Sequence, residues 1–174
     1  MYKRQLYALY KDNDLRKSYF VKYSESGGYV EYVKGGAVAD FSRTSLSANF
    51  LFRTAEAYLN LAEATAYQGK EDDARKALND LRVKRLATGQ YTNSEESGAD
   101  LIELIREERE RELCLEGHRW FDLTRMCTPQ EFVSIIKAAK PESTPKEYHV
   151  KFPIPQREID LSQNMITQNE GYGQ

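Results

Sequence analysis

Several large classes of protein are excluded by what this chain of 174 residues lacks. Two cysteines are too few for a small scaffold held together by disulfide bonds. No stretch longer than nine residues is free of charged side chains, so the chain has no segment of the roughly 20 apolar residues that a membrane-spanning helix requires. Since 25 basic and 27 acidic residues leave a net charge of −2, there is no strong positive field to attract nucleic acid or an anionic membrane surface.

The composition that is present is that of a folded domain. Hydrophobic residues make up 40% of the chain and charged residues 30%, which is typical of a globular protein and unlike a disordered one. A chain of this length corresponds to roughly one domain. Residues 1–5 run into a polar, helix-like segment without a signal-peptide pattern, so we expect either a cytoplasmic protein or a piece of a longer one.

The first third of the chain is rich in tyrosine and predicts a β-hairpin. Seven of the twelve tyrosines lie at or before Tyr32. Residues 19–23 and 29–33 are rich in aromatic and β-branched side chains, and the polar residues 24–28 separate them, as in a hairpin with a five-residue loop. We expect residues 1–47 to form a segment that contains this hairpin, preceded by a short helix within residues 2–10.

From about residue 48 the pattern becomes helical and predicts two antiparallel helices. Gly69 ends the first helix, and acidic residues 71–73 begin the second, where the helix dipole favours negative charge. The pair spans about 33 residues, the size of one tetratricopeptide-type repeat, and no second copy occurs in the chain. We therefore expect it to pack on the rest of this chain or on sequence outside it. The predicted apolar faces are Leu51, Ala55, Tyr58, Leu59 and Ala62 on the first helix and Ala74, Ala77, Leu78 and Leu81 on the second.

The remaining sequence predicts further helices and a polar tail. A third helix is expected at about residues 99–115, a shorter one at 119–126 and another around 132–136. Residues 152–155 must be extended, because each residue before a proline is pushed towards β or polyproline geometry. We predict a mainly α fold with tetratricopeptide-like helical pairs, a small β-hairpin and long irregular segments, in which residues 48–174 form the helical region and the closing tail.

Motifs for catalysis, metals and cofactors are mostly missing. No glycine pattern matches a phosphate-binding loop, and no nucleophile elbow is present. Residues 12–14 resemble the start of a calcium loop, but basic residues stand where the third ligand and the glycine should be. His118 and His149 are 31 residues apart and Cys114 and Cys127 are 13 apart, so neither pair has the spacing of a zinc site. We predict no metal and no cofactor.

In residues 108–123, charged side chains share helix faces with apolar ones. One interpretation is a hydrolase that uses Glu108, Glu112 or Asp122, and the other is a buried ion-pair network that fixes how two helices meet. Interleaved opposite charges neutralise each other, whereas a catalytic site usually leaves one group poised for proton transfer. We favour the structural network, and we assign to it Glu108, Arg109, Glu112, Arg119 and Asp122.

Several short motifs stand in an order that matches one known family. Asp14-Leu15-Arg16 opens the series, and residues 53–64 and 78–82 follow on the predicted helix pair. Residues 108–125 hold the patterns ER-x-x-EL, EG-x-R and DL-x-R, and residues 152–159 and 168–172 close the series. Together these segments resemble the SusD/RagB family of nutrient-binding outer-membrane lipoproteins from Bacteroidetes-type bacteria. The sequence departs from the family at Met126, where tryptophan is common, at Glu170, where proline is usual, and in a short connector after Cys127.

The resemblance implies a fold, a function and a location. Family members are several hundred residues long, so residues 1–174 are expected to be the C-terminal portion of a SusD/RagB-like domain, with the signal and the lipid-bearing cysteine outside this chain. The implied function is non-enzymatic: the protein holds an oligosaccharide or other nutrient for a SusC-type TonB-dependent transporter, at the surface or periplasmic face of the outer membrane. The resemblance also assigns the charged network to the scaffold.

Two further expectations concern what the chain binds. Tyrosine faces can stack on the C–H faces of sugar rings, although packing alone can explain most of these residues. We select Tyr29, Tyr32 and Tyr91 as candidate ligand contacts because they are aromatic and lie in variable segments. The alternative to a glycan-binding protein is a helical adaptor of tetratricopeptide type, which would bind a partner protein through the helix pair at residues 51–81.

Overall fold

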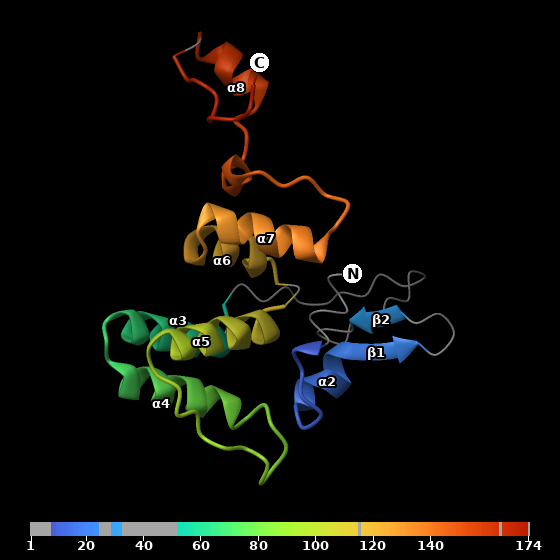
Figure 1. The fold of residues 1–174 in the computed structure, drawn as a ribbon, viewed down its shortest axis with the longest axis vertical. Coiled ribbons are helices and arrows are strands. Elements are labelled where there is room, and N and C mark those ends of the chain that lie inside the picture. The colour runs from blue at the N-terminus through green and yellow to red at the C-terminus, as the bar shows by residue number, and fades with distance from the viewer. Residues whose placement is uncertain (1–7, 25–28, 33–51, 115, 164, 174) are drawn as a thin grey trace. The chain divides into compact units, whose positions relative to one another are not determined.

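A computed structural model describes residues 8–24, 29–32, 52–114, 116–163 and 165–173. Among these residues the fold is mainly α, as the sequence predicts, with seven α-helices, one short 3-10 helix and a two-stranded sheet (Figure 1). The chain forms two compact units, residues 1–119 and residues 120–174, which are described separately below.

The first unit begins with the predicted hairpin. Helix α2 (Leu15–Phe20) runs directly into strand β1 (Val21–Ser24), which pairs antiparallel with β2 (Tyr29–Tyr32). Val21 lies opposite Tyr32 in the register and Ser24 opposite Tyr29, which confirms the hairpin. Its first strand begins at Val21 and not at Tyr19, because Tyr19 and Phe20 still belong to α2. The short helix expected within residues 2–10 lies largely outside the described residues.

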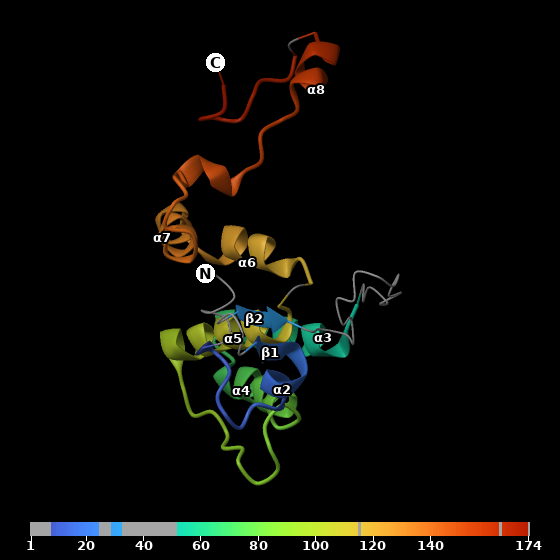
Figure 2. The ribbon, with the colours of Figure 1, turned by 90° about the vertical axis from the view of Figure 1, so that its right-hand side faces the viewer.

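The centre of the first unit is a group of three helices that pack against one another (Figure 1, Figure 2). Helices α3 (Thr54–Tyr67) and α4 (Glu71–Arg82) form the predicted antiparallel pair, and Gly69 makes the turn between them with a φ of 74°. Helix α5 (Gly98–Glu112) packs against both. Their shared core consists of Ala55, Leu59, Ala62, Ala74, Ala77, Leu78, Leu81, Leu101, Ile105 and Leu113.

Two details of α3 differ from the prediction. The helix begins at Thr54 and not near residue 48, because Arg53 has an extended backbone and its side chain reaches across to Glu112 and Glu116. Tyr58 is 36% exposed, since it lies to one side of the face formed by Ala55, Leu59 and Ala62. The predicted contact at Leu51 falls outside the described residues.

The second unit is built around Trp120. Helix α6 (His118–Met126) crosses the division between the units and leads into α7 (Pro129–Ala139), which Thr128 and Glu131 cap with reciprocal hydrogen bonds. The Trp120 ring meets the edge of Phe132 at a centroid distance of 5.2 Å and stacks on Phe152 at 5.0 Å. A 3-10 helix (Glu147–Val150) and α8 (Gln156–Leu161) follow, and the sequence reasoning predicted neither.

The C-terminal tail is hydrogen-bonded to Lys151 and to the extended residues 152–155. The Gln168 amide donates to the Ile154 carbonyl oxygen at 2.8 Å and accepts from the Ile154 amide nitrogen, also at 2.8 Å, so one side chain imitates a strand partner. Asn169 donates to the Phe152 carbonyl oxygen and Tyr172 to that of Lys151. The tail therefore satisfies backbone groups of a proline-containing segment that has no strand beside it in the described part of the second unit.

No helix in the described ranges is both long enough and apolar enough to cross a membrane.

Candidate functional site

The charged side chains of α5 gather into a buried network in the first unit. Glu108 and Glu112 lie one helical turn apart, with only 1% and 4% of their surfaces exposed. Both follow Leu101 and Ile105 along the buried face of α5, so the periodicity that buries the apolar residues carries the two carboxylates inward as well. Buried carboxylates require cationic partners, and arginines from other segments supply them.

Glu112 is the centre of the network. Its Oε1 accepts hydrogen bonds from Arg53 Nη1 and Arg85 Nη2, both at 3.0 Å, and its Oε2 accepts from Arg16 Nη1 at 2.7 Å and Arg85 Nε at 2.9 Å. Burial alone would raise the pKa of Glu112, but the hydrogen bonds from Arg85 and the charge of Arg16 outweigh it and lower the pKa to about 2. The carboxylate therefore stays ionised throughout the physiological pH range.

Glu108 has a parallel set of partners. Its Oε1 lies 2.7 Å from Arg16 Nη1, and its Oε2 accepts from Arg111 Nη2 at 2.9 Å and lies 3.7 Å from Arg82 Nε. Burial would raise the pKa of this carboxyl too, and the charges of Arg16 and Arg111 hold it below its ordinary value.

Arg16 joins the two carboxylates to the N-terminal segment. Its guanidinium donates through Nε to Asp14 Oδ1 at 3.0 Å and through Nη2 to Asp14 Oδ2 at 2.7 Å, a two-bond pairing between neighbours in the sequence. The remaining Nη1 faces Glu108 and Glu112. This arrangement gives the Asp14-Leu15-Arg16 motif a structural role, because Asp14 holds the guanidinium of Arg16 while Arg16 reaches α5.

Counted together, the charges of the network balance. Five arginines (16, 53, 82, 85 and 111) face five carboxylates (14, 107, 108, 112 and 116). A general acid at neutral pH needs a raised carboxyl pKa, whereas those of Glu108 and Glu112 are lowered. The geometry therefore favours a structural role for these residues over the hydrolase interpretation.

The other three residues selected from the sequence also make polar contacts in the structure. Arg109 Nη1 donates to Asn60 Oδ1 at 2.7 Å, Arg119 pairs with Glu110 at 2.8 Å, and Asp122 pairs with Arg125 at 3.2 Å. Each residue turns about 100° around a helix, so Arg109 projects from a different side of α5 than Glu108 and Glu112. Sequence reasoning missed Asp14, Arg16, Arg53, Arg82, Arg85 and Arg111, although the Asp-x-Arg motif was a signal for the first two.

The candidate ligand tyrosines all belong to the first unit. Tyr29 and Tyr32 are the two ends of β2. Tyr91 lies in the loop between α4 and α5, where its hydroxyl donates to Asn79 Oδ1 and the Arg82 guanidinium lies 5.9 Å from its ring centre. The Tyr91 side chain is partly buried, and this burial raises the pKa of its hydroxyl. Within the chain, the Tyr91 hydroxyl is therefore already hydrogen-bonded to Asn79, and the Tyr91 ring already has the Arg82 guanidinium beside it.

Groups suited to metal binding do not gather in the part of the chain that the structure describes. No cluster of three or more histidine, cysteine, aspartate or glutamate residues there could hold a metal ion. Cys114 is buried, with its Sγ 3.3 Å from the Tyr10 hydroxyl, and Cys127 is partly exposed.

Comparison with known proteins identifies a family and individual proteins to which this chain is similar. The sequence pattern of the SusD family matches residues 5–172. The starch-binding protein SusD of Bacteroides thetaiotaomicron is 40% identical over 125 residues, which cover 70% of this chain and 21% of that protein. The chain therefore spans about a fifth of the length of that curated relative.

Solved structures of similar fold come from the same group of proteins. A SusD-like carbohydrate binding protein from Bacteroides vulgatus is 32% identical, with a TM-score of 0.53 over 68% of this chain and 25% of that one. A SusD homologue from Bacteroides thetaiotaomicron is 22% identical and superimposes with a TM-score of 0.67 over 97% of this chain and 38% of that one. The second likeness extends the SusD-like fold to nearly all of the chain.

Proposed function

This chain belongs to the SusD family, and from that membership we propose that it is the C-terminal portion of a protein that binds a glycan without cleaving it. The observation that carries the proposal is the family match over residues 5–172, together with relatives named as starch-binding and carbohydrate-binding proteins. The charged network supports the non-enzymatic part, because its carboxylates are held ionised between arginines and are poorly suited to act as general acids.

The partner that we propose is a SusC-type TonB-dependent transporter of the outer membrane. In this arrangement the protein is tethered to the membrane by a lipid anchor outside these residues and presents its glycan to the transporter. The support is the resemblance of the motifs at residues 14–16, 53–64, 108–125 and 168–172 to those of the family.

Binding without cleavage is tested on the intact protein. Calorimetric titration with a panel of oligosaccharides, beginning with starch fragments because of the curated relative, is expected to give saturable binding for at least one glycan. Chromatography of the same mixtures after prolonged incubation is expected to return the sugars unchanged. Release of shorter sugars would contradict the proposal.

The identity of the partner that the intact protein captures from cells distinguishes the transporter proposal from the adaptor alternative. Affinity capture from detergent-solubilised membranes is expected to recover a large outer-membrane transporter. Recovery of a soluble partner through α3 and α4 would instead favour the adaptor. The structure offers that alternative little free surface on the inner faces of the two helices, because α5 already covers them.

The proposed ligand contacts remain Tyr29, Tyr32 and Tyr91. Each is replaced by alanine in turn in the intact protein. A contact that stacks on a sugar is expected to lower affinity by about fivefold when it is removed, since ring stacking contributes on the order of 1 kcal/mol.

A further inference from the structure

A polar hollow of about 140 Å³ opens beside the charged network in the first unit. Its walls come from four segments: the chain before α2, the end of α4 with the residues that follow, the loop that leads to α5, and α5 itself. A single water needs roughly 10–15 Å³ of such space, so the hollow has room for a small chemical group and not for a whole oligosaccharide.

The side chains around this hollow are mainly cationic. Five basic residues line it (Lys11, Arg16, Arg82, Arg85 and Arg111), and the acidic residues that line it are Asp14 and Glu108. Both carboxylates are already engaged, Asp14 by the fork of Arg16 and Glu108 by Arg16 and Arg111. The acceptor capacity of the walls is therefore largely occupied, and Lys11 adds a positive charge to arginines that Glu107, Glu108, Glu112 and Asp14 otherwise balance.

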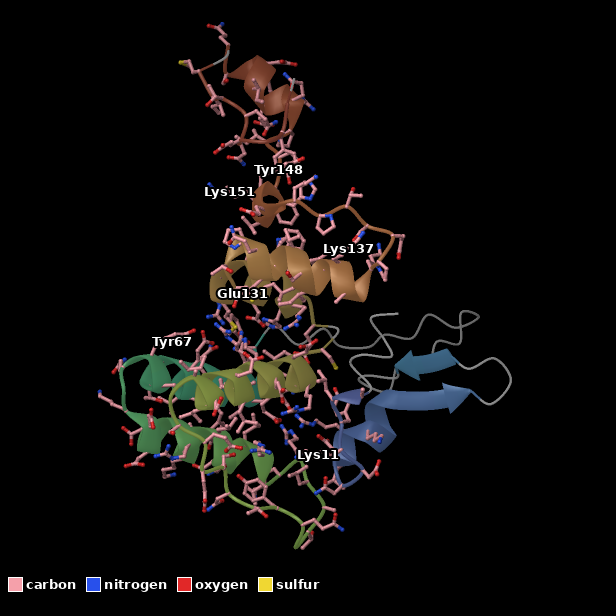
Figure 3. All side chains as sticks on the ribbon, in the orientation of Figure 1. Lys11, Tyr67, Glu131, Lys137, Tyr148 and Lys151 are labelled. Atoms are coloured by element: carbon pink, nitrogen blue, oxygen red, sulfur yellow. The ribbon has the colours of Figure 1, made fainter. Side chains whose placement is uncertain are left out.

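Three of the basic residues keep donors for which the described residues provide no acceptor. Arg82 donates through Nη1 to Ser94, and its Nη2 makes no hydrogen bond within the described ranges. Arg85 uses Nε and Nη2 on Glu112, which leaves its Nη1 without an acceptor there. The Lys11 ammonium, labelled in Figure 3, has no ion pair or hydrogen bond to any described residue, and Lys11 lines the same hollow.

We propose that this hollow binds one oxyanion of an acidic sugar, either the carboxylate of a uronic acid or the ester of a sulfated sugar. Guanidinium groups pair with the oxygens of both anions, and an ammonium adds a third positive contact. Gln90 and Thr92, also in the wall, have polar side chains that could bind neighbouring hydroxyls of the sugar. This inference rests on the proposed glycan-binding function and narrows it to glycans that carry negative charge.

The test is calorimetric titration of the intact protein at low ionic strength with four probes: inorganic sulfate, galacturonate, glucose 6-sulfate and glucose. At least one of the two acidic sugars is expected to bind, and the preferred one identifies the anion. Glucose measures any contribution from the neutral ring. Absence of binding by both acidic sugars, including a result in which only inorganic sulfate binds, would overturn the proposal.

Variants tie the binding to this hollow. Arg82→Gln is expected to lower the affinity for the acidic sugar about tenfold or more, as the loss of a hydrogen bond from a charged donor does. Its fold is expected to survive, because Glu108 keeps Arg16 and Arg111, and thermal unfolding checks this. Lys11→Gln is expected to lower affinity several-fold without touching the network.

Lys84→Gln is the matched control, since Lys84 is exposed, carries the same charge and lies next to Arg85 without lining the hollow. Unchanged affinity in a folded Arg82→Gln protein, or an equal loss in Lys84→Gln, would overturn the proposal. The glycan-binding function itself is judged separately, by neutral oligosaccharides on the unaltered protein, so failure of one is distinguishable from failure of the other.

Discussion

Arg16 and Glu112 lie 96 positions apart in the sequence, and Arg16 Nη1 donates a hydrogen bond of 2.7 Å to Glu112 Oε2. The bond joins the N-terminal segment to the C-terminal end of α5. Arg85, which follows α4, binds the same carboxylate, and its backbone carbonyl accepts from the Leu15 amide at 2.9 Å. Three separate segments thus meet at one buried carboxylate, so its loss should loosen all of them together.

Glu112→Gln is expected to lower the free energy of unfolding by roughly 3–5 kcal/mol, because it leaves buried arginines without their shared anion. Glu107→Gln is the matched control: it removes an α5 carboxylate that is 44% exposed and pairs only with Arg111 among the described residues, and it should cost less than about 1 kcal/mol. Urea unfolding measures both. A Glu112→Gln protein as stable as the Glu107→Gln protein would contradict the scaffold role, and lost catalysis in such a stable variant would revive the hydrolase interpretation.

The stability of the protein should depend on pH through the same carboxylate. The pKa of Glu112 is about 2 in the folded chain and about 4.3 when unfolded, so the unfolded state binds the proton first as the pH falls. The stabilisation, about 3 kcal/mol, is complete above roughly pH 5 and is lost as the pH falls from there towards 2. Urea unfolding between pH 3 and 7 checks this. In Glu112→Gln, the free energy of unfolding should decrease less as the pH falls. If the free energy of unfolding decreased equally steeply in the variant and in the unaltered protein, other carboxylates would cause the pH dependence.

Local patterns in the sequence predict much of this fold, but they do not predict which residues pair across long distances in the sequence. Periodicity identified Ala74, Ala77, Leu78 and Leu81 as one face of a helix, and all four are buried. Alternation and turn residues predicted the hairpin that β1 and β2 form. The short α8 was missed, because six residues between prolines and polar tail give too little periodicity to recognise.

The charged network is also predicted only in its local part. Helix periodicity aligned Glu108 with Glu112, but it carries no information about which arginine reaches them from another segment. Arg16, Arg53 and Arg85 are brought to α5 by the packing of α3 and α4 and by the hydrogen bonds between residues 13–15 and 85–87. The partners considered from the sequence, Arg119 and Asp122, were nearer along the chain; in the structure Arg119 pairs with Glu110, and Asp122 pairs with Arg125.

Tyr91 allows a structural role to be separated from ligand binding. Tyr91→Phe removes the hydrogen bond to Asn79 and should lower the free energy of unfolding by about 1 kcal/mol, with glycan affinity unchanged. Tyr91→Ala also removes the ring, and if this ring stacks on a sugar the affinity should fall about fivefold. Calorimetry and thermal unfolding on the two variants decide between the roles. Equal affinity in the phenylalanine and alanine variants would remove Tyr91 from the candidate ligand contacts.

Gly171 lies against the ring of Tyr148, and this contact should prevent any larger residue from replacing Gly171 without a loss of stability. A Cβ atom at Gly171 would overlap the Tyr148 ring, and the φ of +86° at Gly171 is a conformation that side chains disfavour. Gly171→Ala should therefore displace the tail that Gln168 and Tyr172 fasten, and amide hydrogen exchange should accelerate at Ile154, whose nitrogen donates to Gln168.

Gly89→Ala separates the effect of crowding from that of backbone strain. Its φ of +77° is similar, but nothing lies within 4 Å of an added Cβ, so it should cost only the roughly 1–2 kcal/mol of a left-handed alanine. Gly171→Ala should cost a further 1–3 kcal/mol for the overlap with Tyr148, unless the ring turns away. The double variant Tyr148→Ala with Gly171→Ala should recover that second part, because the obstructing ring is gone. If the two glycine variants lost equal stability, backbone strain alone would account for the glycine in this closing motif, and the fit against Tyr148 would not be its reason.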